Sequence, residues 1–257
     1  MKTLILATAF TALSLTGAQA QSVAALSGDN TISIIDAAAK KVTRTMKISG
    51  ASGSILGIDV RPADGKLYAL ASDGTVYTVD TTTGAATMKS KLETTLKAGV
   101  KATVDFNPVA DRLRVIGSDG TNLRANVDDG KVITDGTLKY AETDANKGKA
   151  PMVTAGAYSN SFAGTKETAL YDIDTATGTF TKQAPPNDGV LMTISTLPLK
   201  DGAAFDIVAD GKGGNMGWII SGDEMHSVDI GTGMTKPFGK IAGLPAGVRD
   251  IAVVGAN

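Results

Sequence analysis

The stretch VDFNPVADRLRVIGSDGTNLRANVDDG, Val104–Gly130, decides the fold. It contains three short apolar runs, and polar turn segments separate them. Asp119-Gly120 and Asp129-Gly130 favour tight hairpins, because glycine adopts positive φ at low steric cost. The stretch therefore predicts a meander of antiparallel strands.

The same meander recurs along the chain with a period of about 45 residues, which is typical of repeat folds. Copies begin at Ile55, Lys101 and Ala203. A further unit, residues 150–199, fits less well. Taking Ala169–Ile173 as its second strand accommodates all of it, whereas placing Tyr171 in a third strand leaves residues 190–199 as a surplus strand. The polar segment 141–149 is predicted to be a loop or a short helix between units.

The two ends of the chain complete one more unit. The residues after position 21 supply only a second, third and fourth strand, while VRDIAVVGAN, residues 248–257, supplies only a first strand. A last strand that completes the unit begun by the first residues is typical of ring closure in a β-propeller. We therefore predict an all-β, five-bladed propeller whose N- and C-terminal strands share one blade.

Residues 1–20, MKTLILATAFTALSLTGAQA, have the pattern of a secretory signal peptide, with a Lys near the start, an apolar run and an Ala-x-Ala site. The alternative is a membrane anchor, but the apolar run is too short to span a bilayer. We predict cleavage before Gln21, one propeller domain over residues 21–257, a periplasmic or secreted location, and no membrane insertion after cleavage.

Composition excludes several classes of function. The chain of 257 residues has a formal net charge of -1, which gives no bias toward nucleic acid. It contains no Cys and one His, His226, so thiol chemistry and metal sites built on several imidazoles are excluded. No Ser lies in a nucleophile motif.

Several strings resemble a known family. They are GIDVRPADGKLYAL, VDFNPVADRLRVIGSDGTNLR, GAYSNS, LYDIDTATG and APPNDG. They resemble a family of secreted bacterial proteins known only as a domain of unknown function, and the resemblance covers nearly the whole mature chain. It implies a propeller-like fold and export, and it implies no catalytic residues.

The first strands of the five units, which line the channel of a propeller, provide the candidate site. Four of the five carry Asp at the same step, so four carboxylates should stand around the axis at similar height. Neighbouring arginines are placed to neutralise them. We predict a polar pocket at one mouth that binds a cation or a small polar ligand. Its residues are Asp59, Arg61, Asp105, Asn107, Tyr158, Asn160, Asp206, Arg249 and Asp250.

An alternative role for these aspartates is structural, because an Asp on an inner strand can accept hydrogen bonds from neighbouring backbone amides. No cofactor is predicted. A Ca2+ site is an alternative, since oxygen ligands are abundant near turns, but no segment follows the EF-hand order. The turn aspartates are Asp128, Asp129, Asp172, Asp174 and Asp188.

Arg112, Arg114 and Arg124 alternate along two paired strands, so they should approach one another. They could receive an anionic partner, or they could pair with Asp111 and Asp128 on a solvated sheet face.

We therefore expect a binding or interaction module for an envelope protein or a small polar ligand. The alternative is a hydrolase or lyase that uses the four axial acids. We favour binding over catalysis, because no catalytic constellation is present.

Overall fold

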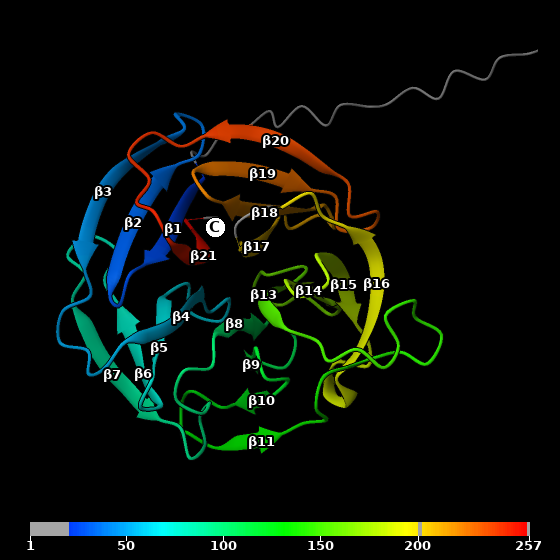
Figure 1. Ribbon diagram of the computed structural model, residues 1–257. Coiled ribbons are helices and arrows are strands. Elements are labelled where there is room, and N and C mark those ends of the chain that lie inside the picture. The colour runs from blue at the N-terminus through cyan, green and yellow to red at the C-terminus, as the bar shows by residue number, and fades with distance from the viewer. Residues whose placement is uncertain (1–20, 200–201, 256–257) are drawn as a thin grey trace, which may run out of the picture.

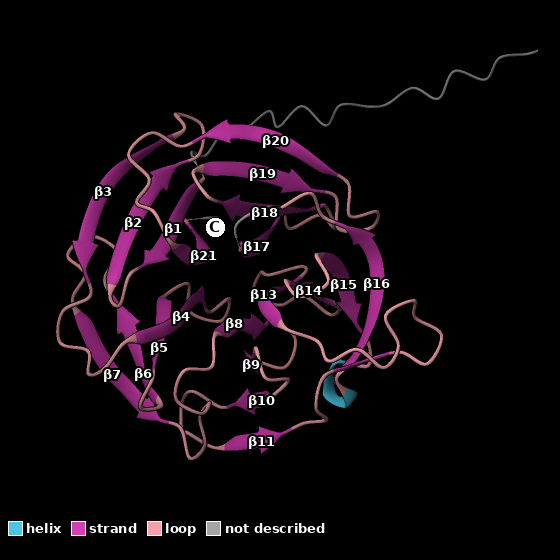
Figure 2. Ribbon diagram, in the orientation of Figure 1, coloured by secondary structure: helices cyan, strands magenta, loops and turns pink. Residues whose placement is uncertain are grey.

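The computed structural model describes residues 21–199 and 202–255. Its strands form five sheets around one central axis (Figure 1), which confirms the five-bladed propeller. A single short helix occurs in this part of the chain, the 3-10 turn η1 (Pro186–Asp188), which is cyan in Figure 2. The predicted signal peptide, residues 1–20, lies outside the described residues.

Each blade is a sheet whose first strand lies at the axis and whose last strand lies at the rim. From the axis outward, blade 1 contains β21 (Val248–Val254), β1 (Ser22–Ser27), β2 (Thr31–Asp36) and β3 (Lys41–Lys47). Blade 2 contains β4 (Ile55–Val60), β5 (Leu67–Ala71), β6 (Thr75–Val79) and β7 (Ala86–Lys91). Blade 3 contains β8 (Ala102–Asn107), β9 (Arg112–Gly117), β10 (Asn122–Ala125) and β11 (Val132–Thr134). Blade 4 contains β13 (Val153–Tyr158), β14 (Leu170–Asp174), β15 (Thr179–Gln183), β16 (Val190–Thr196) and β12 (Lys139–Tyr140). Blade 5 contains β17 (Ala204–Ala209), β18 (Asn215–Ser221), β19 (Glu224–Val228) and β20 (Thr235–Lys240).

Ring closure takes place in blade 1, as the sequence predicts. β1 pairs antiparallel with β21, so that Ala24 lies opposite Ala252. On its other side β1 pairs with β2. The first described strand therefore lies between its sequence neighbour and the last strand of the chain.

Blade 4 resolves the ambiguity in residues 150–199. β14 is the second strand and contains Tyr171, while β16 supplies the fourth strand, so the prediction for Ala169–Ile173 is confirmed. β12 has no counterpart in the predicted strands; its Tyr140 lies opposite Leu191 in a parallel pairing with β16. The predicted loop, residues 141–149, follows β12 as a series of turns.

The hydrophobic core consists of five clusters, one between each pair of neighbouring blades. The inner strands are buried on both faces, because each faces two blades. In β1, for example, Ala24 and Leu26 pack toward blade 2, whereas Val23 and Ala25 pack toward blade 5. The cluster between blades 3 and 4 has the fewest apolar members, and buried polar side chains fill the rest of that interface.

Residues 21–199 and 202–255 contain no helix with the length and apolar character that crossing a bilayer requires.

Ending the chain after Gly247 should abolish cooperative folding. The truncation removes β21, so β1 becomes an unpaired inner edge and the clusters on both of its faces lose buried side chains such as Ile251 and Ala252. Circular dichroism melting and size-exclusion chromatography would detect this loss. A chain that ends at Gly255 is the matched control and should melt cooperatively. Similar melting of the two chains would contradict closure by the tails.

Candidate functional site

Aspartates of the inner strands join neighbouring blades at the axis. Each accepts a hydrogen bond from a backbone N–H of the next inner strand, and a buried carboxylate needs such donors. The four bonds are Ile58 N to Asp250 Oδ2 at 2.8 Å, Phe106 N to Asp59 Oδ2 at 2.6 Å, Tyr158 N to Asp105 Oδ1 at 2.9 Å, and Val253 N to Asp206 Oδ2 at 2.6 Å. The structural role that the sequence left open is therefore present at all four positions.

The remaining junction, between blades 4 and 5, uses asparagines. Asn160 N donates to Asn215 Oδ1 at 2.7 Å, and Asn215 Nδ2 donates to Asn160 Oδ1 at 2.8 Å. Asn160 has a φ of 55° just after β13, a conformation that asparagine tolerates better than most residues. Side chains thus bridge all five junctions of the ring.

Gly57 makes one of these bridges possible. A Cβ at this position would lie 2.6 Å from Asp250 Oδ2 and 2.7 Å from a methyl group of Val104. Because both distances are below van der Waals contact, any other residue would displace the carboxylate that Ile58 N contacts. The glycine therefore allows the inner strands to converge.

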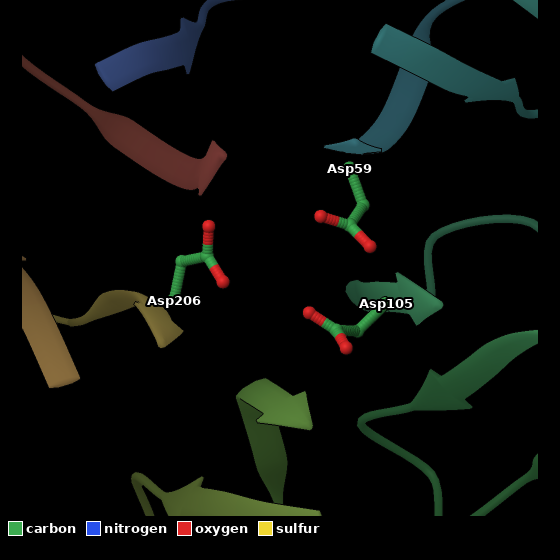
Figure 3. A group of neighbouring side chains, drawn as sticks. All are labelled: Asp59, Asp105 and Asp206. Atoms are coloured by element: carbon green, nitrogen blue, oxygen red, sulfur yellow. The ribbon is translucent and has the colours of Figure 1, made fainter. Parts of the chain in front are cut away.

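Three of the four carboxylates form a tight group on the axis. Asp59, Asp105 and Asp206 each have an oxygen within 4.8 Å of the other two (Figure 3), and their side chains enter from β4, β8 and β17. They are 4%, 5% and 5% exposed, so they are screened from bulk water. The fourth, Asp250, is equally buried but lies outside this group.

Burial dominates the electrostatics of the axial group. It raises the pKa of Asp59 and of Asp105, and repulsion from Asp206 and Asp59, respectively, raises each further. Burial also raises the pKa of Asp206 to about 6, and backbone hydrogen bonds oppose this shift. Desolvation likewise raises the pKa of Asp250. The site accordingly favours a proton or a cation on these oxygens.

A cavity of about 40 Å³ lies beside this group, where the inner strands β4 and β17 end. Asp59 and Asp206 lie in its wall, together with residues that follow the inner strands, among them Pro62, Ser161 and Phe162. These loop residues are not among the predicted site residues. They lie one to four residues beyond the aligned strand segments, and their position directly after those segments is the sequence signal that indicates them.

The two predicted arginines do not pair with the axial acids. Arg61 points into the neighbouring blade, where Nη2 lies 2.6 Å from Asp111 Oδ2 and 2.8 Å from Asp128 Oδ2. Arg249 donates to backbone carbonyls of the β1–β2 turn and of β4, including Gly28 O at 2.8 Å. Neither arginine therefore forms an ion pair with an axial acid, because their long side chains reach acceptors away from the axis. The charge of Arg249 nevertheless lowers the pKa of Asp250.

Tyr158 and Asn107 also face away from the axial group. The backbone of Tyr158 contributes to the ring, but its hydroxyl accepts a hydrogen bond from Arg114 Nε at 3.1 Å. Asn107 Oδ1 accepts hydrogen bonds from Val109 N and Ala110 N and so shapes the turn after β8. Of the nine predicted site residues, the structure brings Asp59, Asp105 and Asp206 together, with Asp250 beside them in the ring.

Arg114 organises a buried polar layer between blades 3 and 4. It is 2% exposed, and its Nη1 lies 2.6 Å from Asp135 Oδ2. Arg124 shares the same carboxylate. The arginines therefore do approach each other, but the predicted partners Asp111 and Asp128 are wrong, since those two acids bind Arg61. Arg112 instead donates to the carbonyl of Asp111.

Asp172 lies in this layer with an unusual environment. It is 0% exposed, and neither of its oxygens has a hydrogen-bond partner among the described residues. The side chain occupies the space over Gly156, which lies opposite it on β13 and has no Cβ to exclude it. Burial raises the pKa of Asp172 to about 8, against the opposing field of Arg114.

The other turn aspartates do not gather into a metal site. Asp128 binds Arg61 and Lys89, and Asp174 accepts a hydrogen bond from the Tyr140 hydroxyl at 2.6 Å. Within residues 21–199 and 202–255, the acids close enough together to hold one ion are those of the axial group.

The fold and the site define a class: an all-β, five-bladed propeller whose inner strands carry a ring of buried carboxylates. The profile of a family described as a domain of unknown function, DUF4394, matches residues 31–252. The chain therefore belongs to this family, as the sequence strings indicated.

Three solved structures resemble this chain at low sequence identity. A protein of unknown function from Bacteroides thetaiotaomicron is 15% identical, with a TM-score of 0.54, over 91% of this chain and 70% of that chain. A protein of unknown function from Bacteroides caccae is 13% identical, with a TM-score of 0.47, over 87% of this chain and 73% of that chain. An auxiliary nutrient binding protein from Bacteroides ovatus is 16% identical, with a TM-score of 0.47, over 76% of this chain and 51% of that chain. The curated proteins contain no match to the sequence.

Replacing Asp172 by Asn should reduce the dependence of stability on pH. A carboxyl whose pKa is higher in the folded chain than in the unfolded chain adds stability that is complete below about pH 4 and is lost as the pH rises through about 8. Urea unfolding should show that the free energy of unfolding falls between pH 5 and pH 8.5 in the parent protein. This fall should exceed the fall for Asp172→Asn by on the order of 3 kcal/mol.

Asp210→Asn is the control for this experiment. Asp210 is exposed, and hydrogen bonds from the backbone amides of Lys212 and Gly214 lower its pKa, so it titrates below this pH range. The control should keep the full pH dependence. An unchanged slope in Asp172→Asn would show that the buried carboxyl is not protonated in the folded protein.

Proposed function

We propose that this protein is an exported binding module. It binds a polar group of a small ligand or of an envelope protein at the mouth of its channel. The observation that carries the proposal is the cavity at that mouth, because buried carboxylates in its wall leave a polar recess beneath a partly apolar rim. Phe162 and Val208 supply apolar surface beside Asp59 and Asp206. Apolar walls with a few convergent polar groups are typical of ligand sites.

The volume of the cavity limits the size of the group that can bind in it. At about 40 Å³ it is much smaller than pockets that enclose a whole ligand, which measure about 300–1,000 Å³. It has room for a single polar group, while the remainder of the ligand would lie on the rim. The same limit disfavours the hydrolase or lyase alternative, since a scissile bond could not be seated between Asp59, Asp105, Asp206 and Asp250.

Export is part of this proposal and rests on the sequence of residues 1–20. Expression with the complete chain in a Gram-negative host should yield a mature protein that begins at Gln21 in the periplasmic or culture fraction. Intact-mass measurement and N-terminal sequencing check this result. A protein that retains Met1 and stays in the cytoplasm would remove export from the proposal.

Filling the mouth should abolish ligand binding. Ala209 lines the cavity at the end of β17, so a Trp at this position would occupy the recess. Saturation-transfer NMR with a panel of sugars, amino acids and polyamines should identify binders of the parent protein. Their affinity should fall at least tenfold in Ala209→Trp, which corresponds to about 1.4 kcal/mol.

Met88→Trp is the matched control, because Met88 is 60% exposed on the outer strand β7, far from the axis in Figure 1. It should bind the same compounds as the parent protein. Equal binding to both Trp variants would place the ligand site elsewhere, and a panel without any binder would contradict the small-ligand form of the proposal.

A further inference from the structure

We propose that Asp59, Asp105 and Asp206 hold one divalent cation, of the Ca2+ type, on the propeller axis. This inference rests on the proposed function, because it concerns the floor of the same cavity. The ion would be bound jointly by three blades, beneath any ligand at the mouth of the cavity.

The spacing of the three carboxylates fits a single ion. Ca2+ takes oxygen ligands at 2.3–2.6 Å, so two ligands of one ion lie at most about 5 Å apart. The three side chains each offer an oxygen within 4.8 Å of the other two. Figure 3 shows that the carboxylates point toward one another from β4, β8 and β17, so no side-chain reorientation is needed to surround an ion.

No positive side chain within residues 21–199 and 202–255 neutralises this group. The ion pairs among the described residues include neither Asp59 nor Asp105 nor Asp206, and the nearest arginines in sequence, Arg61 and Arg249, are bound elsewhere. Like charges at such short range in a buried site repel strongly. A divalent cation removes most of this repulsion and leaves in place the hydrogen bonds that these aspartates accept from the next inner strand.

An unsatisfied oxygen provides an independent indication of a ligand. Both oxygens of Asp59 and of Asp206 accept backbone hydrogen bonds. Asp105 is only 5% exposed. Its Oδ1 accepts a hydrogen bond from Tyr158 N, whereas its Oδ2 accepts no hydrogen bond from the described residues. The Asp105 carboxylate faces the space that the three acids share.

The cavity supplies the rest of the coordination shell. A water molecule needs about 10–15 Å³ of such volume, so about 40 Å³ accommodates two or three waters beside Asp59 and Asp206. Three carboxylate oxygens and three such waters make up the six ligands that Ca2+ requires at minimum. Because backbone bonds already fix the carboxylates, the site favours Ca2+, which tolerates irregular geometry, over Mg2+, which demands a regular octahedron.

The test uses the mature chain, Gln21–Asn257, and CaCl2 alone. After treatment with chelator, isothermal titration should show one Ca2+ bound per chain, and Ca2+ should raise the melting temperature by several degrees, with a smaller effect of Mg2+. Asp105→Asn should bind Ca2+ at least tenfold more weakly, because it loses the charge but keeps an oxygen that can accept the hydrogen bond from Tyr158 N.

Asp172→Asn is the matched control, since it makes the same substitution at a buried Asp away from the axis. It should bind Ca2+ like the parent protein. If Asp105→Asn does not fold, the titration of the parent protein still decides, because the absence of Ca2+ binding there overturns the proposal. Equal Ca2+ affinity in parent and Asp105→Asn would also overturn it.

The two proposals fail separately. Failure to bind Ca2+ while Ala209→Trp still abolishes binding of the small-molecule panel would refute the ion and leave the mouth as the ligand site. The reverse result, Ca2+ binding without any ligand at the mouth, would leave the ion as a structural element of the ring.

Discussion

The structure depends on one constraint: five small sheets must converge on an axis where no strand can pair with the next by a regular ladder. The inner strands of neighbouring blades face each other, so backbone N–H groups there would lack acceptors. Side-chain oxygens meet this need at every junction, from Asp at four of them and from Asn215 at the fifth. The glycine at position 57 is a consequence of this convergence, because a Cβ there would collide with Asp250 and Val104.

Local patterns made the ring predictable. The repeat, the Asp-Gly turns and the incomplete units at the two ends depend on residues close together in sequence, and they gave the blade count, the closure by β21 and the register of the axial aspartates. What escaped prediction depends on side-chain reach between blades. Arg61 extends to acids of blade 3, and Asp172 enters a space that exists only because Gly156 lies opposite it. β12 escaped because a two-residue parallel pairing has no sequence pattern of its own.

The interface between blades 3 and 4 shows how one blade can differ without breaking the ring. Its apolar cluster is the smallest of the five, and Arg114 with Asp135 occupies volume that aliphatic side chains fill elsewhere. A buried ion pair contributes little stability on its own, but its geometry is demanding, so it can fix the relative position of two sheets. Blade 4 also lacks an axial Asp and carries two buried acids one strand further out, Asp172 and Asp174.

The hydrogen bonds between the inner strands do not by themselves explain why the axial side chains are acidic. An amide oxygen accepts a backbone hydrogen bond as a carboxylate does, and the junction between blades 4 and 5 shows that asparagine can do this work. Asparagine would avoid the desolvation and repulsion that raise the pKa of Asp59 and Asp105. The chain nevertheless places aspartate at three positions within 4.8 Å of one another. Hydrogen bonding between neighbouring blades does not require the negative charge of these three carboxylates, whereas binding of a cation does.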